Sequence, residues 1–155
     1  MPDGDYAGFV ERRSPGVNPS GPIVDQEGHT LGRHPGVHRY TIGQRRGLGL
    51  SGPGPRYVLS LSSETRTVVV GSEDELQSGT LIARDVNWLS TAPPSGPREA
   101  QVKIRYRHAE ASARLVPLDH GRVQVEFEVP QRAVAPGQAA VFYDGDVCLG
   151  GGWIE

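Results

Sequence analysis

Two adjacent arginines inside a glycine-rich stretch are the first residues of this sequence that could bind an anion. The stretch runs from Val37 to Leu50, and Gln44, Arg45 and Arg46 lie among its glycines. An arginine side chain presents a planar set of N–H donors that matches phosphate or carboxylate oxygens. No acidic residue occurs in 28–63, although the net charge of the chain is −2. We expect an anion-binding face here, with nucleic acid as its partner; a solvated turn explains the same pattern equally well.

A second basic pair lies in the other half of the chain, where Arg105 and Arg107 flank Tyr106. If this segment is extended, the two arginines share one face and Tyr106 lies on the other. Their side chains would then be roughly 6–7 Å apart, which suits successive phosphates of a nucleic-acid backbone. From the pattern alone, a solvated strand face is the slightly better interpretation.

Other residues that carry chemistry in some proteins have simpler explanations in this sequence. His29, His34 and His38 are five and four residues apart across a hairpin and a turn, so we expect exposed loop histidines and no metal site. Cys148 follows a valine and precedes a leucine, which indicates a small buried hydrophobic residue. The glycines at 150–152 suit either the close approach of an RNA backbone or a flexible strand edge.

Composition narrows the class of protein. The 155 residues include 36% hydrophobic residues, 21 glycines and 13 prolines, which is typical of short strands joined by turns. A single cysteine excludes an internal disulfide and fits a reducing cytoplasm. No signal peptide or membrane-length apolar run is recognisable, so we expect a cytoplasmic protein without a membrane partner.

The elements that must position these residues are mainly β-strands. A short helix is expected over 6–13, capped by Asp5. The glycine-rich stretch 37–50 is expected to begin as a strand over 37–42. The acidic, turn-like segment 71–75 predicts a boundary between a small β-rich domain, 1–75, and an antiparallel β-barrel, 76–155. Asp144-Gly145 predicts a type I′ hairpin. Strands are expected over 23–25, 29–31, 56–61, 65–70, 81–88, 100–107, 111–118, 122–129, 139–143 and 147–149.

Four segments, in order and spacing, resemble the bacterial tRNA-specific 2-thiouridylases. They are Tyr40-Thr41-Ile42-Gly43-Gln44-Arg45-Arg46-Gly47-Leu48-Gly49, Arg105-Tyr106-Arg107, Pro136-Gly137-Gln138-Ala139-Ala140-Val141-Phe142-Tyr143, and Val147-Cys148-Leu149-Gly150-Gly151-Gly152. The resemblance implies a β-rich central domain followed by a six-stranded barrel like domain 2 of translation elongation factors.

The resemblance also implies what the chemistry requires. In that family a separate N-terminal domain binds ATP with magnesium, two cysteines carry the reaction, and a persulfide protein donates sulfur. The pyrophosphate-binding loop of that domain is absent from this sequence, and Cys148 matches a strand cysteine rather than a catalytic one. We therefore expect a fragment that binds tRNA, but not DNA, and that lacks catalytic residues and cofactors of its own.

Specific tRNA contacts follow from the same resemblance. Positions matching Arg105 and Tyr106 contact tRNA in the family, as does the position of Gln138, whose amide can read a sugar hydroxyl or a base edge. Arg107, Arg45, Arg46 and Gln44 are further candidates from the motifs above. A non-enzymatic RNA-binding barrel of the translation-factor type remains the alternative, and a protein-interaction module is a weaker third possibility.

Overall fold

The computed structural model describes residues 13, 20–90, 92–106 and 109–155. These residues are mainly in strands, as predicted, and their helical segments beyond Arg13 are two 3₁₀ turns, η1 (Val37–Arg39) and η2 (Asp74–Leu76). The helix expected over 6–13 lies outside the described residues except for Arg13. No helix of the described part is long and apolar enough to cross a membrane.

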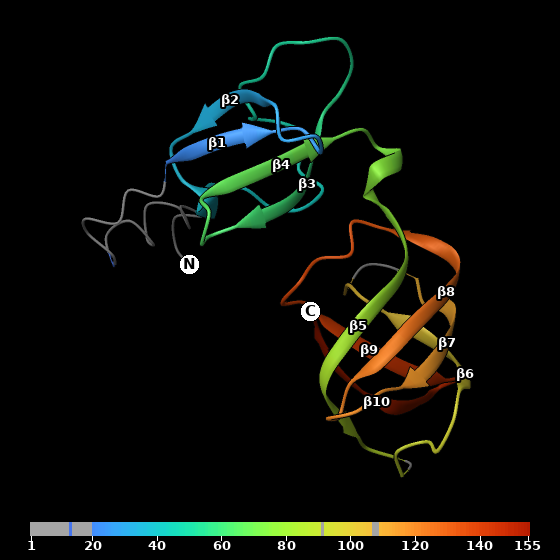
Figure 1. The fold of residues 1–155 in the computed structure, drawn as a ribbon. Coiled ribbons are helices and arrows are strands. Elements are labelled where there is room, and N and C mark those ends of the chain that lie inside the picture. Colours follow the sequence, from blue (N-terminus) through green and yellow to red (C-terminus); the bar gives the residue numbers. More distant parts are fainter. Residues whose placement is uncertain (1–12, 14–19, 91, 107–108) are drawn as a thin grey trace. The chain divides into compact units, whose positions relative to one another are not determined.

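The chain divides into two compact units, and the boundary between them in the sequence falls between Leu76 and Gln77. The first contains a four-stranded mixed sheet in the order β2-β1-β4-β3, in which β1 and β4 are parallel and the other pairs are antiparallel (Figure 1). Its strands are β1 (Gly21–Val24), β2 (Thr30–His34), β3 (Tyr57–Ser62) and β4 (Thr67–Gly71).

β1 and β2 form a hairpin where strands were expected over 23–25 and 29–31. Gly28 has φ of 86°, a left-handed conformation that glycine adopts without steric cost. The backbone N–H of Asp25 donates to the carbonyl of His29 at 3.0 Å, which closes the turn. The sheet buries Ile23, Val58, Val68 and Val70 completely.

The strand predicted over 37–42 is wrong. Val37–Arg39 forms the η1 turn, and the chain then runs as loop until β3 begins at Tyr57. Val37 is buried and Tyr40 packs partly against the same core, so the apolar side chains that face the sheet are three residues apart rather than two. The backbone N–H of Tyr40 donates to the carbonyl of Val37 at 3.0 Å, which fixes this tighter spacing.

The second unit is a closed barrel of six strands, as predicted. Neighbouring strands pair antiparallel in the cyclic order β10-β5-β8-β7-β6-β9. Closure leaves no open sheet edge, which removes the main route to edge-to-edge aggregation. The strands are β5 (Gln77–Trp88), β6 (Arg98–Lys103), β7 (Ala111–Pro117), β8 (Val123–Arg132), β9 (Ala139–Asp144) and β10 (Val147–Ile154).

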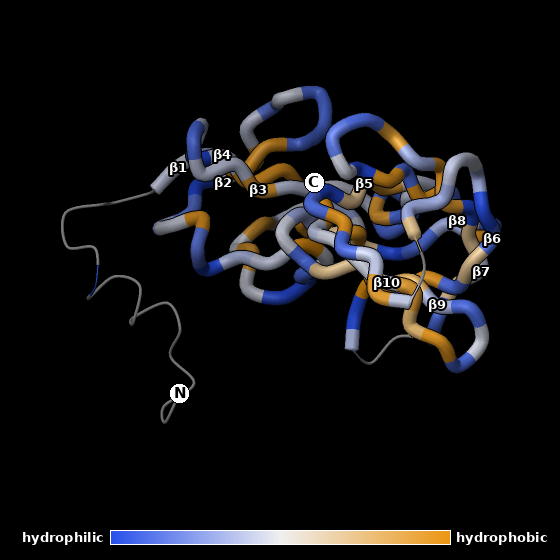
Figure 2. Tube along the Cα trace, turned by 90° about the horizontal axis from the view of Figure 1, so that it is seen from below, coloured by the Kyte–Doolittle hydropathy of each residue, from blue (hydrophilic) through white to orange (hydrophobic). Residues whose placement is uncertain are grey.

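Alternation along each strand builds the barrel interior. On β8, Val123, Val125 and Phe127 are buried, whereas Gln124 and Glu126 between them are only partly covered. The same period of two places Phe142 inward and its neighbours outward on β9. Figure 2 shows the resulting mixture of apolar and polar positions along the barrel strands.

The β9–β10 hairpin is present, but its turn differs from the one predicted. Val147 pairs with Asp144, so Gly145 and Asp146 are the central residues. Gly145 has φ of 54°, while Asp146 is not among the described residues with positive φ. A type I′ turn needs positive φ at both central positions, so the I′ prediction is wrong.

The glycines at 150–152 allow neighbouring strands to approach closely, and the interpretation as a flexible strand edge is wrong. A Cβ atom on Gly150 would lie 2.2 Å from the carbonyl oxygen of Asn87, and one on Gly151 would lie 2.5 Å from that of Ala140. These positions are packed between β5 and β9 inside a closed barrel. They are therefore not a flexible edge.

Candidate nucleic-acid interface

A surface hollow on the barrel gathers residues from two separate segments of the second unit, 103–106 and 138–143. Its volume is about 340 Å³. Arg105 and Tyr106 contribute from the segment after β6, and Gln138 from the turn before β9. Its lining residues are Lys103, Ile104, Arg105, Tyr106, Gln138, Ala139, Val141 and Tyr143.

Barrel closure explains why these distant segments meet. β6 pairs with β9 so that Lys103 lies opposite Val141 and Val102 lies opposite Phe142. The turn that carries Gln138 is held by β10, because the backbone N–H of Ile154 donates to the carbonyl of Gln138 at 2.8 Å. The Gln138 side chain is exposed at this fixed backbone position.

The predicted geometry of the arginine pair is wrong. β6 ends at Lys103, because its partner strand β7 begins at Ala111, opposite Val102, and the chain must turn in between. Arg105 therefore lies in a bend, so a shared strand face with Arg107 does not exist; Arg107 itself is outside the described residues.

Arg105 and Tyr106 have different surroundings. The guanidinium of Arg105 is partly buried and donates a hydrogen bond to the carbonyl of Ala133. This contact orients one of its N–H donors inward and leaves others for a second partner. The Tyr106 side chain is 93% exposed, so its ring is open to stack on a planar partner.

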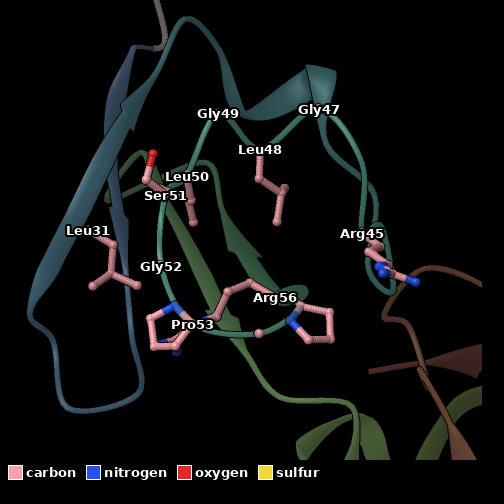
Figure 3. A pocket seen from close by; sticks show the side chains of 12 residues that line it. Leu31, Arg45, Gly47, Leu48, Gly49, Leu50, Ser51, Gly52, Pro53 and Arg56 are labelled. Atoms are coloured by element: carbon pink, nitrogen blue, oxygen red, sulfur yellow. The ribbon is translucent and has the colours of Figure 1, made fainter.

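The basic loop of the first unit borders a separate hollow of about 420 Å³. Figure 3 shows the loop curving around it, with Leu48 and Leu50 pointing inward and Arg45 on the side away from Leu31. Arg45 and Arg46 are both exposed, and neither forms an ion pair with any residue that the structure describes. Arg45 lines this hollow and Arg46 does not.

Gln44 is used inside this turn. Its Oε1 accepts a hydrogen bond from the backbone N–H of Thr41 at 3.0 Å, and its Nε2 donates to the carbonyl of Arg46 at 2.9 Å. Its backbone carbonyl also accepts from the N–H of Val58 at 2.9 Å, which ties the turn to β3. These bonds give Gln44 a structural role, the placement of the two arginines, that the sequence did not reveal.

The expectation that all three histidines are exposed holds for His29 but is wrong for His38, which is half-buried, and for His34. His34 is 2% exposed at the end of β2, and its Nε2 lies 3.1 Å from the carbonyl of Arg66. Burial, together with the charges of Arg33 and His38, lowers the pKa of His34, although the bond to Arg66 acts in the opposite direction. Its ring also packs edge-on against Tyr40, with 5.5 Å between the ring centroids.

His29 lies with Asp25 and Glu27 at the tip of the β1–β2 hairpin. The Asp25 carboxylate accepts from the backbone N–H of His29 at 2.8 Å, and its second oxygen lies 3.1 Å from Nδ1. Because the turn itself accounts for these contacts, the cluster needs no metal to explain it. Cys148 is half-buried rather than fully buried as expected.

Sequence reasoning missed several residues that line the barrel hollow, among them Lys103, Val141 and Tyr143. The alternation around the buried Phe142 places Val141 and Tyr143 outward, so period 2 could have identified them. It could not have shown that β6 and β9 are neighbours, because their pairing joins segments about 40 residues apart in the sequence.

Comparisons with known proteins cover both units. Residues 8–72 match a family model described as a tRNA methyl transferase PRC-barrel domain, and residues 78–154 match an aminomethyltransferase β-barrel domain. The tRNA-specific 2-thiouridylase of Solibacter usitatus is 54% identical over 163 residues, covering 100% of this chain and 44% of the relative. That of Syntrophotalea carbinolica is 49% identical over 99% of this chain and 44% of its own length. The chain thus spans about 44% of the length of these curated relatives.

Proposed function

Since the chain belongs to the tRNA-specific 2-thiouridylase family, we propose that it binds tRNA and positions it for 2-thiolation of the wobble uridine. In a full-length protein of this family, ATP with magnesium would activate the uridine and a persulfide protein would supply sulfur. This chain contributes the tRNA-holding surfaces of that cytoplasmic enzyme and no catalytic residue.

One observation carries the proposal: the barrel hollow brings Arg105, Tyr106 and Gln138 together. These side chains offer three complementary contacts to RNA. A guanidinium binds backbone phosphate, an exposed phenol ring stacks on a base, and an amide hydrogen-bonds to a sugar hydroxyl or base edge. A hollow lined in this way suits a nucleic-acid strand better than a small-molecule substrate.

The exposed Arg45 and Arg46 provide a second contact, by charge rather than by shape. Their segment contains no acidic residue, so it attracts phosphate without competition from nearby carboxylates. The Gln44 bonds hold the turn that presents them. Arg107 completes the set of proposed tRNA-binding residues.

A non-enzymatic RNA-binding barrel would also use these contacts. The two named relatives favour the thiolation enzyme, because each aligns with both units, at 54% and 49% identity, rather than with the barrel alone.

The direct test is titration of a fluorescently labelled tRNA transcript with the purified 155-residue chain at several salt concentrations. We expect binding that weakens linearly on a log–log plot as salt rises, as phosphate contacts require. No binding at low salt would contradict the proposal. The same chain, given ATP, magnesium and a persulfide donor, should form no 2-thiouridine in that tRNA.

A further inference from the structure

Trp153 stands on the outer face of the barrel, between two neighbouring strands. On β9 its directly opposed residue is Ala139, and on β5 it is Arg84. Directly opposed residues in antiparallel strands project from the same face of the sheet. Trp153 is 51% exposed, whereas Ile154, the next residue, is 2% exposed and faces the core. The indole therefore lies on the surface, in a row with Arg84 and Ala139.

This row continues into the barrel hollow. Ala139 belongs to the hollow's lining, and Gln138 precedes it in the chain. Opposed Cβ atoms in such pairs are about 4.5–5.5 Å apart, so the Trp153 side chain starts about this far from the Cβ atom of Ala139. The hydrogen bond from Ile154 N–H to Gln138 O, at 2.8 Å, fixes the two segments against each other. Trp153 therefore lies next to Ala139, a lining residue of the hollow that holds Gln138, without lining the hollow itself.

The surroundings leave the indole accessible. Ala139 is small, and Gly151, two residues before Trp153 on the same strand, has no side chain to cover it. The barrel's other tryptophan, Trp88, packs against Phe142 with 5.8 Å between ring centroids, but Trp153 takes part in no ring pair among the described residues. A tryptophan that points inward fills the core, whereas a tryptophan that points outward and is half exposed contributes little to the stability of the fold.

We propose that Trp153 is a stacking platform for an unpaired nucleotide of RNA, next to the hollow that holds Arg105 and Gln138. The proposal rests on the tRNA-binding function and deepens it, because it specifies single-stranded nucleotides at this surface. Bases in an RNA duplex are stacked on one another, and only unpaired bases offer a face to an aromatic side chain. The hollow beside it provides room for the sugar and phosphate that accompany such a base.

The charges around Trp153 favour RNA over an apolar protein segment. Arg84 lies next to it on the outer face, and Lys103 and Arg105 lie across the hollow. Arg84 pairs with Asp85, and Lys103 lies 3.6 Å from Glu110. The first pair is solvent-exposed and the second is partly exposed, and such surface pairs contribute little free energy and can be exchanged for phosphate contacts.

Nuclear magnetic resonance of the whole chain tests the proposal, because its two tryptophans give two indole N–H signals. The Trp153→Phe variant identifies which signal belongs to Trp153. The probes are a single-stranded RNA of about 12 nucleotides and an RNA duplex of the same length. We expect the single strand to shift the Trp153 signal and the duplex to leave it in place. Equal shifts with both probes, or none with the single strand, would overturn the proposal.

Affinity measurements with a tRNA transcript provide the second readout. Loss of one base stack corresponds to about 1–3 kcal/mol, or about 5- to 140-fold in affinity, and Trp153→Ala should fall in this range. Trp153→Phe keeps an aromatic face and should retain most of the affinity. The matched control is Val147→Ala, which removes another outward side chain, 52% exposed, from the opposite end of β10 and should bind normally.

The affinities of the variants distinguish the stacking role of Trp153 from tRNA binding by the chain as a whole. Wild-type affinity in folded Trp153→Ala, with weakened binding in Gln138→Ala, would overturn the stacking role and leave tRNA binding intact. A wild-type chain that binds no tRNA would overturn both. Thermal unfolding of each variant shows whether its fold is preserved.

Discussion

The guanidinium of Arg105 donates a hydrogen bond to the backbone carbonyl of Ala133, a buried residue with φ of 55°. A positive φ in a residue with a side chain carries a steric cost, so contacts that hold it in place matter for the barrel. Arg105 thus has a structural role in addition to its proposed contact with tRNA.

Replacing Arg105 with alanine should lower the stability of the barrel. Loss of the hydrogen bond leaves the Ala133 carbonyl without its partner, at a cost of about 1–2 kcal/mol. Both tryptophans belong to the second unit, so their fluorescence during urea unfolding measures this change. Tyr106→Ala is the matched control: its side chain is 93% exposed and its removal should change stability by less than about 0.5 kcal/mol. Equal stabilities of both variants would mean that the Ala133 contact contributes nothing.

Reversing the charge of Arg45 and Arg46 together should weaken tRNA binding and leave the melting temperature nearly unchanged. Both side chains are exposed, and neither forms an ion pair with a described residue, so the fold loses no partner. Charge reversal of Arg66, an exposed arginine of the same unit outside the acid-free segment, controls for net charge. A fall in melting temperature with normal tRNA affinity would instead assign the two arginines to the structure.

The first unit should lose stability as the pH falls below about 6.5, the ordinary pKa of histidine. Burial lowers the pKa of His34 in the folded state, so the unfolded chain binds a proton more readily. The carbonyl of Arg66 can only accept, so Nε2 carries the ring proton in the folded state, and Nδ1 is buried without a partner. A proton on Nδ1 would therefore lack an acceptor.

Hydrogen exchange of amides in β1 and β4 measures this pH dependence within the whole chain. In His34→Gln the side-chain amide can still donate to Arg66, but it has no proton to gain in this pH range. The variant should therefore show a flatter pH dependence than the wild type. Identical pH profiles for the two proteins would rule out His34 as the cause.

Gly152→Ala should destabilise the barrel by about 1–3 kcal/mol, the usual cost of forcing extra volume into a packed site. A Cβ atom there would lie 2.5 Å from the carbonyl oxygen of Arg84 and 2.9 Å from a methyl group of Val86. Gly79→Ala, in β5, meets nothing within 4 Å and provides the control. Urea unfolding followed by tryptophan fluorescence compares them, and equal midpoints would contradict the close-packing explanation.

The barrel could be predicted because apolar and polar residues alternate along its strands, and this alternation determines which face of each strand is buried. On β8 a shift of one residue would turn Val123 and Val125 to solvent, so the sequence specifies which face is buried. Gly145 marked the connection between the last two strands for a similar reason, since few other residues adopt a positive φ.

The failures arose where tertiary contacts decide the local structure. Val37 and Tyr40 have strand-favouring side chains, yet both pack against the sheet from a 3₁₀ turn, Val37 as its first residue and Tyr40 as the residue that follows it. The strand expected to continue through Arg107 ends at Lys103, because the pairing of β6 with β7 limits its length. His34 looked like a loop residue, and only the position of the Arg66 carbonyl, 32 residues away, explains its burial.

Within the candidate site, the sequence identified residues but not their arrangement. Arg105, Tyr106 and Gln138 were named from a family resemblance, and the β6–β9 pairing places them at one hollow. Trp153 escaped notice because its register with Ala139 and Arg84 exists only in the folded barrel.

The salt dependence of tRNA affinity in two single variants tests the central claim most directly. Arg105→Ala should reduce the slope of log affinity against log salt by about 0.7–0.9, because one phosphate contact is lost. Gln138→Ala should weaken binding and leave the slope unchanged, since an amide releases no counterion. Arg114→Ala, an exposed arginine on β7 outside the hollow, should match the wild type in both respects. Wild-type affinity in both Arg105→Ala and Gln138→Ala would remove the barrel hollow from the tRNA-binding surface.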